Sequence, residues 1–582
     1  MKKIGLLFAF IFAISEQGFG QLKYDNVWTI GFRKITPSPN GYPLGGIVTN
    51  FNDSPPSFIL QDYIFDRPKA TISDKKGQLV AYTNGCVVVN RNHELMVNGD
   101  TLNPGNVFLE FCENGDYPLW QPTIFLPKPG SDNLYYLFHI RDDDYSWDPI
   151  NLMYSVIDAS GDAGNGAVVT KNKSVLSDSS HLGGYVTATH HANGRDWWVV
   201  VPREFSNNMH VTLLTPDTVE YKGMQDFDHL NLEIDNYPWG SQTAFSADGC
   251  KYFRNSPKSL FILDFDRCTG QLSNPLRLDW DSLPFGGGGV AVSPNSRFLY
   301  LSSGETVQQY DLWSSDLAAS MQVVAQYDGF LAPYSTKFFQ MMPGPDGKIY
   351  IVSTADSKVL HVIHNPNVRG LACNVEQHAY ILPARTSVLT PNFANYNLGP
   401  IDGSTCDTLG INNLPIARFQ WNVEDTLSPM HIAFTDYTYH APTSWHWDFG
   451  DGSSSAETNP VHLYAVPGIY TVCLIACNAN ACDTVCQMVE IKAVHTLELF
   501  SEGETVQLWP NPARDLLHLQ SESLIESIKI FDSLGGEVVL PSQAVIVEGQ
   551  IAIDIHLLPP GLYYFSLRAG NKIWGGRFVK GG

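Results

Sequence analysis

Short apolar strands separated by tight turns recur along the first 400 residues of the chain. Each turn contains Gly, Asp or Asn, and β-branched or aromatic residues follow it, as in Leu134–Phe138 and Trp197–Val200. Such segments are typical of β-strands bounded by turns rather than of helices. The turns centre near residues 77, 132, 194, 248, 296 and 347, about 48–62 residues apart. That period predicts four-stranded propeller blades.

The later copies add a third strand that ends in Asp before a polar turn, as in Phe261–Asp266 and Val307–Asp311. This arrangement resembles the repeats of bacterial propeller proteins. Six copies are visible, and residues 22–60 and 380–398 would form a seventh, closed by strands from both ends of the domain. We therefore expect an all-β fold with a propeller of six to seven blades, seven favoured, at residues 22–400. An array of β-sandwiches is the alternative.

A different alternation marks residues 415–492, after a turn-rich stretch at 401–414 that we interpret as a linker. Trp447 and Phe449 share one face of a strand that runs into a tight turn. The segment Trp447, Asp448, Phe449, Gly450, Asp451, Gly452 resembles the motif of the PKD domain, an immunoglobulin-like sandwich. Trp445 has the same parity as Trp447, so one of the two should lie at the sandwich edge.

Four cysteines in this region fit a hairpin. If residues 478–481 form its loop, paired positions have a constant sum, and both Cys477–Cys482 and Cys473–Cys486 sum to 959. Directly opposed cysteines of this kind can form disulfides. A four-cysteine zinc site is the alternative. The other disulfide candidates, in even number before residue 410, are Cys86, Cys112, Cys250, Cys268, Cys373 and Cys406.

The last module, residues 505–582, follows a second predicted linker at 493–504 and contains no cysteine. Its turn and strand residues resemble the C-terminal sorting domain of type IX secretion. The residues that carry this resemblance are Pro510, Asn511, Pro512, Gly535, Pro560, Gly561, Tyr563, Phe578, Val579 and Lys580. The resemblance implies that residues 505–582 contact the type IX secretion machinery. It also implies a Gram-negative host and a product that is secreted or held on the outer cell surface, via the periplasm.

The first twenty residues are typical of a secretory signal peptide. Lys2 and Lys3 precede an apolar stretch from Ile4 to Ile14, and small residues surround a cleavage point near Gly20. A buried N-terminal helix is the alternative. No later segment has about eighteen consecutive apolar residues, so the sequence predicts no transmembrane anchor. Ten cysteines fit an oxidising destination.

Composition narrows the classes of function. The 582 residues are 44% hydrophobic and 16% charged, which indicates several folded domains. The formal net charge of −23 argues against nucleic-acid binding, since Lys and Arg must neutralise phosphates. No cofactor is predicted, and Ca²⁺ is the one metal we keep open.

Few residues point to chemistry. His190 and His191 suit a polar loop better than a chelating pair, because adjacent strand residues face opposite sides. The run Asp142 to Asp144 offers carboxylates for Ca²⁺ but lacks a spaced loop pattern, so a solvated charge run is favoured. Gly286 to Gly289 is no phosphate loop. The tryptophans considered as sugar-stacking platforms, with burial in the blade core as the favoured alternative, are Trp147, Trp197, Trp198, Trp239 and Trp313.

Two functions follow from these patterns. The favoured one is a secreted or cell-surface binding and adhesion protein. Its propeller would be an interaction platform for a polysaccharide or surface protein, and its PKD domain a spacer or accessory binder. The alternative is a secreted propeller hydrolase acting on glycans or lactone-like substrates. We expect a plugged central channel to favour binding, and a cluster of His, Asp or Glu in it to favour the enzyme.

Overall fold

The computed structural model describes residues 22–581 except 37–40, 54, 114, 144–147, 179–181, 231–241, 280–287, 426–427, 492–496, 502–503, 522–524, 532–536, 539–544, 548–549, 560 and 570–571. Residues 21–413 form one compact unit, and residues 414–582 belong to a second. The expected signal peptide lies outside the described residues, as do Gly535 and Pro560 of the sorting motif, Trp147 and Trp239.

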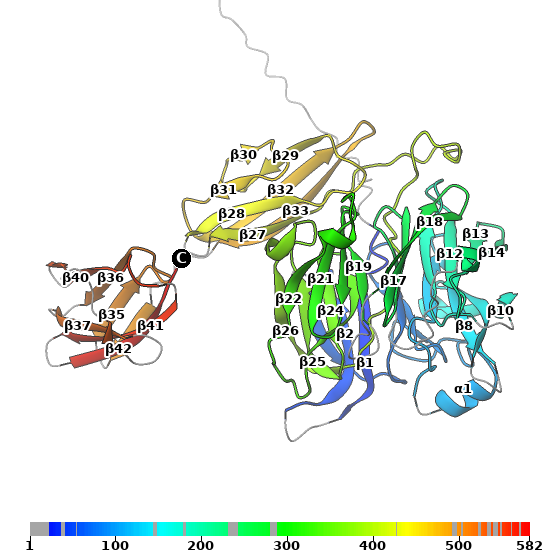
Figure 1. Ribbon diagram of the computed structural model, residues 1–582, viewed down its shortest axis with the longest axis horizontal. Coiled ribbons are helices and arrows are strands. Elements are labelled where there is room, and N and C mark those ends of the chain that lie inside the picture. The colour runs from blue at the N-terminus through cyan, green and yellow to red at the C-terminus, as the bar shows by residue number, and fades with distance from the viewer. Residues whose placement is uncertain are drawn as a thin grey trace, which may run out of the picture. The chain divides into compact units, whose positions relative to one another are not determined.

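Four-stranded antiparallel sheets make up most of the first unit (Figure 1). In each, strands consecutive in sequence are hydrogen-bonded neighbours. The sheets are β7 (Thr123–Pro127), β8 (Leu134–Asp142), β9 (Pro149–Asp158) and β10 (Ala167–Ser177); β11 (Thr187–His190), β12 (Trp197–Pro202), β13 (Met209–Leu214) and β14 (Val219–Gln225); β15 (Gln242–Phe245), β16 (Lys251–Asn255), β17 (Ser259–Asp266) and β18 (Gln271–Asp279); and β19 (Val290–Val292), β20 (Phe298–Ser302), β21 (Thr306–Asp311) and β22 (Gln322–Gln326).

Two further sheets complete the described part of this unit. One has three strands, β4 (Ala70–Ser73), β5 (Leu79–Thr83) and β6 (Val88–Asn90), and a short helix, α1 (Asn106–Phe111), follows it. The other combines β1 (Val27–Thr36), β2 (Leu44–Asn50) and β3 (Ser57–Gln61) with β23 (Phe338–Pro343), β24 (Ile349–Ser353), β25 (Ser357–Ile363) and β26 (Val375–Thr386).

That last sheet brings the two ends of the domain together. Strand β2 pairs with β26 in parallel at Leu44 and Arg385, so N-terminal and C-terminal strands share one sheet. Because β1–β3 form no separate sheet in the described structure, the seventh blade remains a prediction. Of residues 380–398, which we expected to contribute to a closing blade, 380–386 belong to β26 and 387–398 form no strand.

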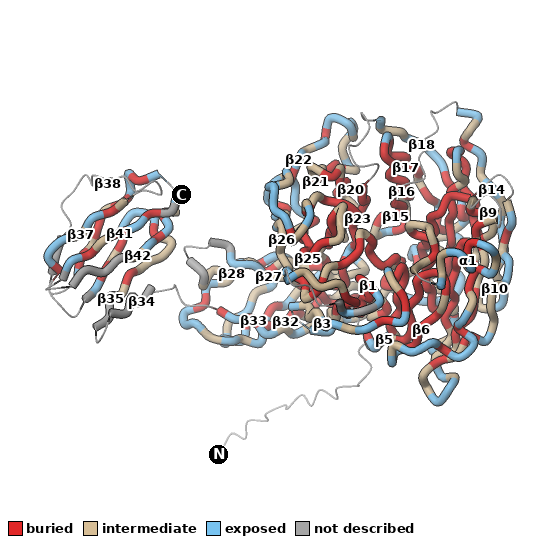
Figure 2. Tube along the Cα trace, turned by 90° about the horizontal axis from the view of Figure 1, so that it is seen from below, coloured by how far each residue is buried: buried red, intermediate tan, exposed pale blue. Residues whose placement is uncertain are grey.

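The innermost strands lie side by side around a common centre. Strand β4 contacts β1 and β7, and β15 contacts β11 and β19, which in turn contacts β23. The unit is an all-β propeller, as predicted from the period of the turns. The strands are mostly buried and the connecting loops mostly exposed (Figure 2).

All six turns found in the sequence join the first strand of a sheet to its second. Gly77, Gly194, Gly249 and Gly347 have positive φ there, which explains the glycine in each turn. Antiparallel order places these turns on one face of the propeller, which we call the turn face. The connections from second to third strand, and from one sheet to the next, lie on the opposite side, which we call the loop face.

The second unit begins with a β-sandwich. Its described sheets are β27 (Phe419–Asp425), β28 (Ser428–Asp436) and β31 (Val461–Leu463), and β29 (Ser444–Asp448), β30 (Ser454–Ser455), β32 (Gly468–Cys477) and β33 (Cys482–Ile491). Trp447 is fully buried in the core, against Phe419 and Phe434. Trp445 is half-buried and donates its indole N–H to Asp436, so it takes the edge position.

The C-terminal module has two described sheets. They are β34 (Leu497–Ser501), β35 (Glu504–Trp509), β36 (Leu516–Ser521), β39 (Val545–Val547) and β40 (Gln550–Asp554), and β37 (Ile525–Phe531), β38 (Glu537–Val538), β41 (Gly561–Ala569) and β42 (Lys572–Lys580). Leu508, Leu519, Ile553 and Phe565 are among the residues of a single buried core. The predicted linker boundaries, 401–414 and 493–504, remain predictions, although β34 lies within the second range.

Candidate functional site

The chain itself runs through the centre of the propeller. Residues 387–401 leave β26 at the loop face, where the Thr390 N–H donates to Gln340 Oε1 of β23. Tyr396, which is buried, donates its hydroxyl to the Phe125 carbonyl of β7. At the turn face, the Ile401 N–H donates to the Ala192 carbonyl. The central channel, where the alternative hydrolase would have its site, is thus occupied by this segment, which we call the channel segment.

Asn392 anchors the channel segment through its side-chain amide. Its Nδ2 donates to the carbonyls of Thr123 (2.9 Å) and Val186 (2.7 Å), and its Oδ1 accepts from Gln121 Nε2 (2.8 Å). The backbone N–H of Asn392 also donates to the Lys69 carbonyl (2.9 Å). Through its side-chain amide and its backbone N–H together, this one buried residue links the beginnings of three neighbouring sheets, and none of its donors is unsatisfied.

Arg267 fixes the channel segment where it leaves the propeller. This buried guanidinium donates to the carbonyls of His190 (2.8 Å), His191 (3.4 Å) and Gly399 (2.6 Å). The next residue, Cys268, forms a disulfide with Cys406. Residues 401–406 are thereby bonded to the sheet β15–β18, and the stretch to residue 413 belongs to the first unit.

The backbone carbonyls of His190 and His191 both accept from Arg267 at this exit. His190 is buried with its ring 3.5 Å from that of Trp197, centroid to centroid. Burial, helped by nearby Arg267, lowers the pKa of His190 to about 3, so the ring is neutral at physiological pH. Trp197 and Trp198 are both buried, so neither is a sugar platform.

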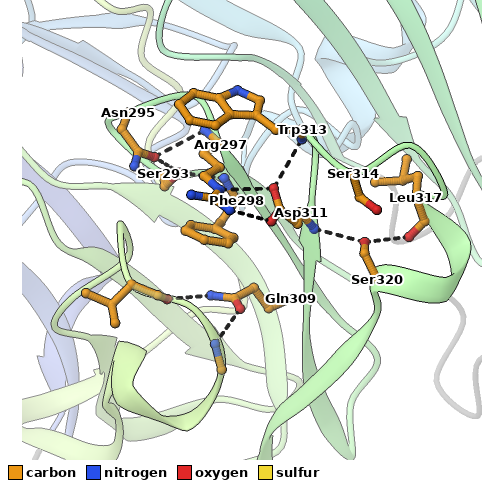
Figure 3. A network of polar contacts seen from close by, with 12 residues as sticks. Ser293, Asn295, Arg297, Phe298, Gln309, Asp311, Trp313, Ser314, Leu317 and Ser320 are labelled. Carbon is orange, nitrogen blue, oxygen red and sulfur yellow. Dashed lines mark hydrogen bonds and ion pairs between the residues drawn. The ribbon is translucent and has the colours of Figure 1, made fainter.

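Trp313 differs from these tryptophans because it is 68% exposed. It lies beyond the end of β21 on the turn face, where Figure 3 shows it above the side chain of Arg297. The guanidinium carbon of Arg297 is 5.0 Å from the Trp313 ring centroid and 5.0 Å from that of Phe298. Arg297 is thus stacked between two aromatic rings.

Asp311 holds both partners of this stack. Its Oδ1 accepts from Arg297 Nε (3.1 Å) and from the Trp313 N–H (3.1 Å), and its Oδ2 accepts from Arg297 Nη2 (2.8 Å) (Figure 3). The main chain of Asp311 is also held, because its N–H donates to Ser320 Oγ. The exposed indole therefore has a defined orientation. Sequence reasoning noted the Asp that ends this strand but missed its pairing with Arg297.

The acidic run expected to be solvated is partly buried. Asp142, the last residue of β8, is only 1% exposed, and neither carboxylate oxygen has a hydrogen-bond partner among the described residues. Burial raises its pKa to about 8, with Asp148 and Glu204 adding to the effect. The favoured interpretation of a solvated charge run is therefore wrong for Asp142. Asp144 lies outside the described residues.

Four disulfides are formed. Cys473–Cys486 and Cys477–Cys482 bridge directly opposed positions of β32 and β33, the pairs that the register arithmetic gives. Cys86–Cys112 and Cys268–Cys406 lie in the propeller. Cys250 and Cys373, counted as candidates, are not disulfide-bonded. The nearby Cys268 pairs with Cys406 instead, and Cys373 is buried in an apolar cluster against β22 and β25.

The PKD motif builds a turn around a buried tryptophan. Trp447 donates its indole N–H to the Glu457 carbonyl, and Phe449 stacks on His462 at 4.1 Å between centroids. Asp448 Oδ1 accepts from the Gly450 N–H, and both Gly450 and Gly452 have positive φ. His462 Nε2 lies 2.7 Å from Asp451 Oδ2. These contacts are structural and stabilise the turn.

The described sorting-motif residues meet although they lie at opposite ends of the module. Asn511 Oδ1 accepts from the Val579 N–H (2.8 Å), and Ala513 pairs with Lys580. Tyr563 stacks on Phe578 with 5.6 Å between ring centroids. Pro510, Pro512 and Gly561 occupy the turn and strand ends beside them. The described motif residues around Asn511, Tyr563 and Phe578–Lys580 therefore lie together in the folded module.

Within the described residues, no three His, Cys, Asp or Glu side chains are arranged as a ready metal site. No described helix is long and apolar enough to cross a membrane.

Two modules match known families. Residues 412–493 match the model described as "PKD domain", and residues 507–580 match "Secretion system C-terminal sorting domain". No curated protein matches the chain. Among solved structures, the PKD1 domain of the Vibrio cholerae metalloprotease PrtV is 28% identical, with 14% of this chain and 98% of that chain covered and a TM-score of 0.12.

The propeller is also similar, at low sequence identity, to solved structures of other proteins. A candidate 6-phosphogluconolactonase from Bacteroides uniformis is 15% identical, with coverage of 62% of this chain and 98% of that chain and a TM-score of 0.39. One from Bacteroides fragilis is 13% identical, with coverage of 63% and 97% and a TM-score of 0.36. These similarities carry no functional argument. The sorting domain, in contrast, marks the chain for export by type IX secretion to the cell surface or outside, and implies interaction with that machinery.

Proposed function

We propose that this exported protein binds a polysaccharide through the turn face of its propeller, with the PKD domain as spacer or accessory binder. The observation that carries the proposal is Trp313, which is exposed and yet oriented by the Arg297–Asp311 pair. A flat indole presents a large apolar face at low entropic cost, which suits stacking against a sugar ring. Trp313 was one of five tryptophans considered for this role from the sequence.

Preorganisation supports binding at this position. An exposed tryptophan on a mobile loop would lose side-chain entropy on association, whereas Trp313 is already restrained by its stacked cation and its anchored backbone N–H. Asp311 and Arg297 also place polar groups beside the ring, where sugar hydroxyls need hydrogen-bond partners. The platform is built on the ends of rigid strands, β20 and β21.

The channel segment supports binding over hydrolysis. A propeller hydrolase would need its central channel for substrate, and here residues 387–401 fill that space with hydrogen bonds to the inner strands. Removing the segment would leave Thr123, Val186 and Gln121 with buried polar groups unsatisfied. A channel filled by the protein's own chain suits a propeller that binds its ligand on an outer face.

The test is a glycan array followed by calorimetry with the best ligand, on the full secreted chain. W313A should weaken binding about tenfold or more, as expected for an aromatic anchor. R297K should weaken it less, because Lys keeps the charge but loses the bidentate and stacking geometry. L371A is the matched control, since Leu371 is 76% exposed on another turn-face segment.

Equal affinity of W313A and wild type would overturn the proposal. So would exclusive binding to a surface protein, or turnover of a glycan or lactone by the full chain in a broad hydrolase screen. Because Trp313 is exposed, W313A should unfold at the same temperature as wild type, so a loss of binding would not reflect a loss of fold.

A further inference from the structure

Asp142 lies at the loop face in an environment that does not satisfy a carboxylate. Both carboxylate oxygens are buried, and neither has a hydrogen-bond partner in the described part of the chain. Its backbone N–H donates to the Tyr117 hydroxyl oxygen (2.8 Å), which fixes the main chain at this point. An isolated buried carboxylate is costly unless it holds a proton or meets a positive charge. With its pKa raised to about 8 by burial, Asp142 holds a proton near neutral pH, and among the described residues neither oxygen has a hydrogen-bonding partner or a contacting cation.

Two further carboxylates approach Asp142 through the strand register. Asp142 pairs with Pro149, so Asp148 is next to its cross-strand neighbour. The Leu182 N–H donates to the Pro149 carbonyl, and Leu182 pairs with Arg203, which precedes Glu204. A continuous row of backbone pairs thus runs from one sheet to the next. Asp148 and Glu204 are each about half-buried, and both act electrostatically on Asp142.

The nearby basic side chains are bonded to other groups. Lys69 Nζ lies 2.7 Å from Asp116 Oδ2 and donates to the Leu119 carbonyl (2.6 Å). Arg141 Nε donates to the Pro104 carbonyl (2.6 Å). Both lower the pKa of Asp142, but burial and the two acidic neighbours outweigh them. Glu204 shows the same excess of negative charge, since burial and Asp148 raise its pKa to about 7.

From this geometry we infer a divalent-cation site at the loop face, with Asp142 as the principal ligand and Asp148 and Glu204 as the supporting carboxylates. The donor atoms are all oxygens, which favours a hard cation of the Ca²⁺ class over Zn²⁺. A cation would neutralise the three carboxylates together and satisfy the two unpartnered oxygens of Asp142.

The expected affinity is that of an extracellular module. Asp148 and Glu204 are not arranged around Asp142 as a finished cage, so binding must draw at least one of them in. That adjustment costs affinity, and Ca²⁺ sites of extracellular modules have dissociation constants on the order of 10⁻⁴–10⁻³ M. The site is distinct from the Trp313 platform, which lies on the other face of the propeller.

The experiment uses the full chain after treatment with a chelator. Ca²⁺ from 10⁻⁵ to 10⁻² M is titrated while the unfolding temperature is recorded, and Tb³⁺ luminescence excited through tyrosine reports occupancy, because Tyr117 is adjacent to Asp142. Wild type should gain a few degrees at saturation. D142N, which keeps the shape but removes the charge, should lose at least tenfold in Ca²⁺ affinity.

Two further variants test the proposed Ca²⁺ site. D132N removes a carboxylate that is largely exposed and paired with Lys75, and should bind Ca²⁺ like wild type. E204Q alters a half-buried position and should weaken Ca²⁺ several-fold even if D142N fails to fold. Because protons compete with the cation for Asp142, affinity should rise from pH 6 to pH 8. An unchanged Ca²⁺ response in D142N or E204Q, or no response up to 10⁻² M, would overturn the inference.

Discussion

The two disulfide regions of the chain stabilise different things. In the PKD hairpin, Cys473–Cys486 and Cys477–Cys482 are 13 and 5 residues apart and cross-link strands that are already paired along ten residues. In the propeller, Cys268 and Cys406 are 138 residues apart, and their bond fixes the end of the channel segment. The hairpin disulfides join strands whose pairing the local sequence already determines. The propeller disulfide instead joins two segments that no local sequence pattern brings together.

Removing the propeller bond should have the largest effect. C268S/C406S loses a constraint on a 138-residue loop, worth about 5 kcal/mol in the unfolded-state entropy model. The propeller transition in denaturant, followed by tryptophan fluorescence, should shift accordingly. C86S/C112S, with a 26-residue separation, is the matched control and should lose about 3.5 kcal/mol. Equal losses in the two variants would mean that the channel segment does not need the Cys268–Cys406 bond.

Removing the amide of Asn392 should rank next. N392A deletes three side-chain hydrogen bonds and leaves the buried carbonyls of Thr123 and Val186 unsatisfied, which costs about 2–4 kcal/mol. The denaturant midpoint of the propeller measures the loss. N395A, which removes a donor to the Ala247 carbonyl from a half-buried position, is the control and should cost about 1 kcal/mol. A larger loss in N395A would contradict the central role given to Asn392.

Removing a hairpin bond should have a smaller effect. C477S/C482S opens a loop closed over only 5 residues, worth about 2 kcal/mol, and the ladder of β32 and β33 stays in place. Chemical denaturation of the full chain, followed at the PKD transition, measures this loss. If the variant lost more than C268S/C406S, the ranking of the two regions would be reversed.

Acidification should have the smallest effect on stability, and it should affect the propeller at a higher pH than the PKD domain. Burial lowers the pKa of His139 and His190 to about 3 and that of His361 to about 4, below the ordinary value near 6.5. Below pH 6.5 the unfolded state therefore binds more protons at these groups, and the propeller loses stability. The raised pKa values of Asp142 and Glu204 act in the opposite direction and offset part of the loss.

The denaturant midpoint of the propeller should thus be lower at pH 5 than at pH 7. In the PKD domain, hydrogen bonds from Ser453 and His462 outweigh burial and hold the pKa of Asp451 at about 2. Its contribution is present above pH 4 and is lost only as the pH falls towards 2. A propeller midpoint that rises on acidification would show that the carboxyl groups outweigh the histidines.

Sequence patterns predicted most of the architecture because turns and strand parity are local. The six turns mark the first two strands of six sheets, and residues 447–452 and 510–512 identify two modules. Hairpin register, too, follows from counting residues across a loop. The path of residues 387–401 was not predicted, because the partners of Asn392 lie between 206 and 323 residues away in sequence and no periodicity connects them.

The candidate sites were harder to predict for a related reason. Trp313 was identified as one of five tryptophans, but exposure separates it from Trp197 and Trp198, and exposure depends on which strands surround a side chain. Asp142 looked solvated because two more aspartates follow it. Its burial depends on how the end of β8 packs in the folded propeller, which no local pattern of the sequence records.

The bond between Cys268 and Cys406 also determines how the molecule carries a mechanical load. A ligand that pulls on the propeller while the C-terminal end is held would apply tension through residue 406. The covalent bond passes that tension directly into the strand that precedes Cys268, so residues 387–401 bear none of it. Unthreading of the channel would then require either the rupture of a covalent bond or the unfolding of the sheet β15–β18, and shear alone would not suffice.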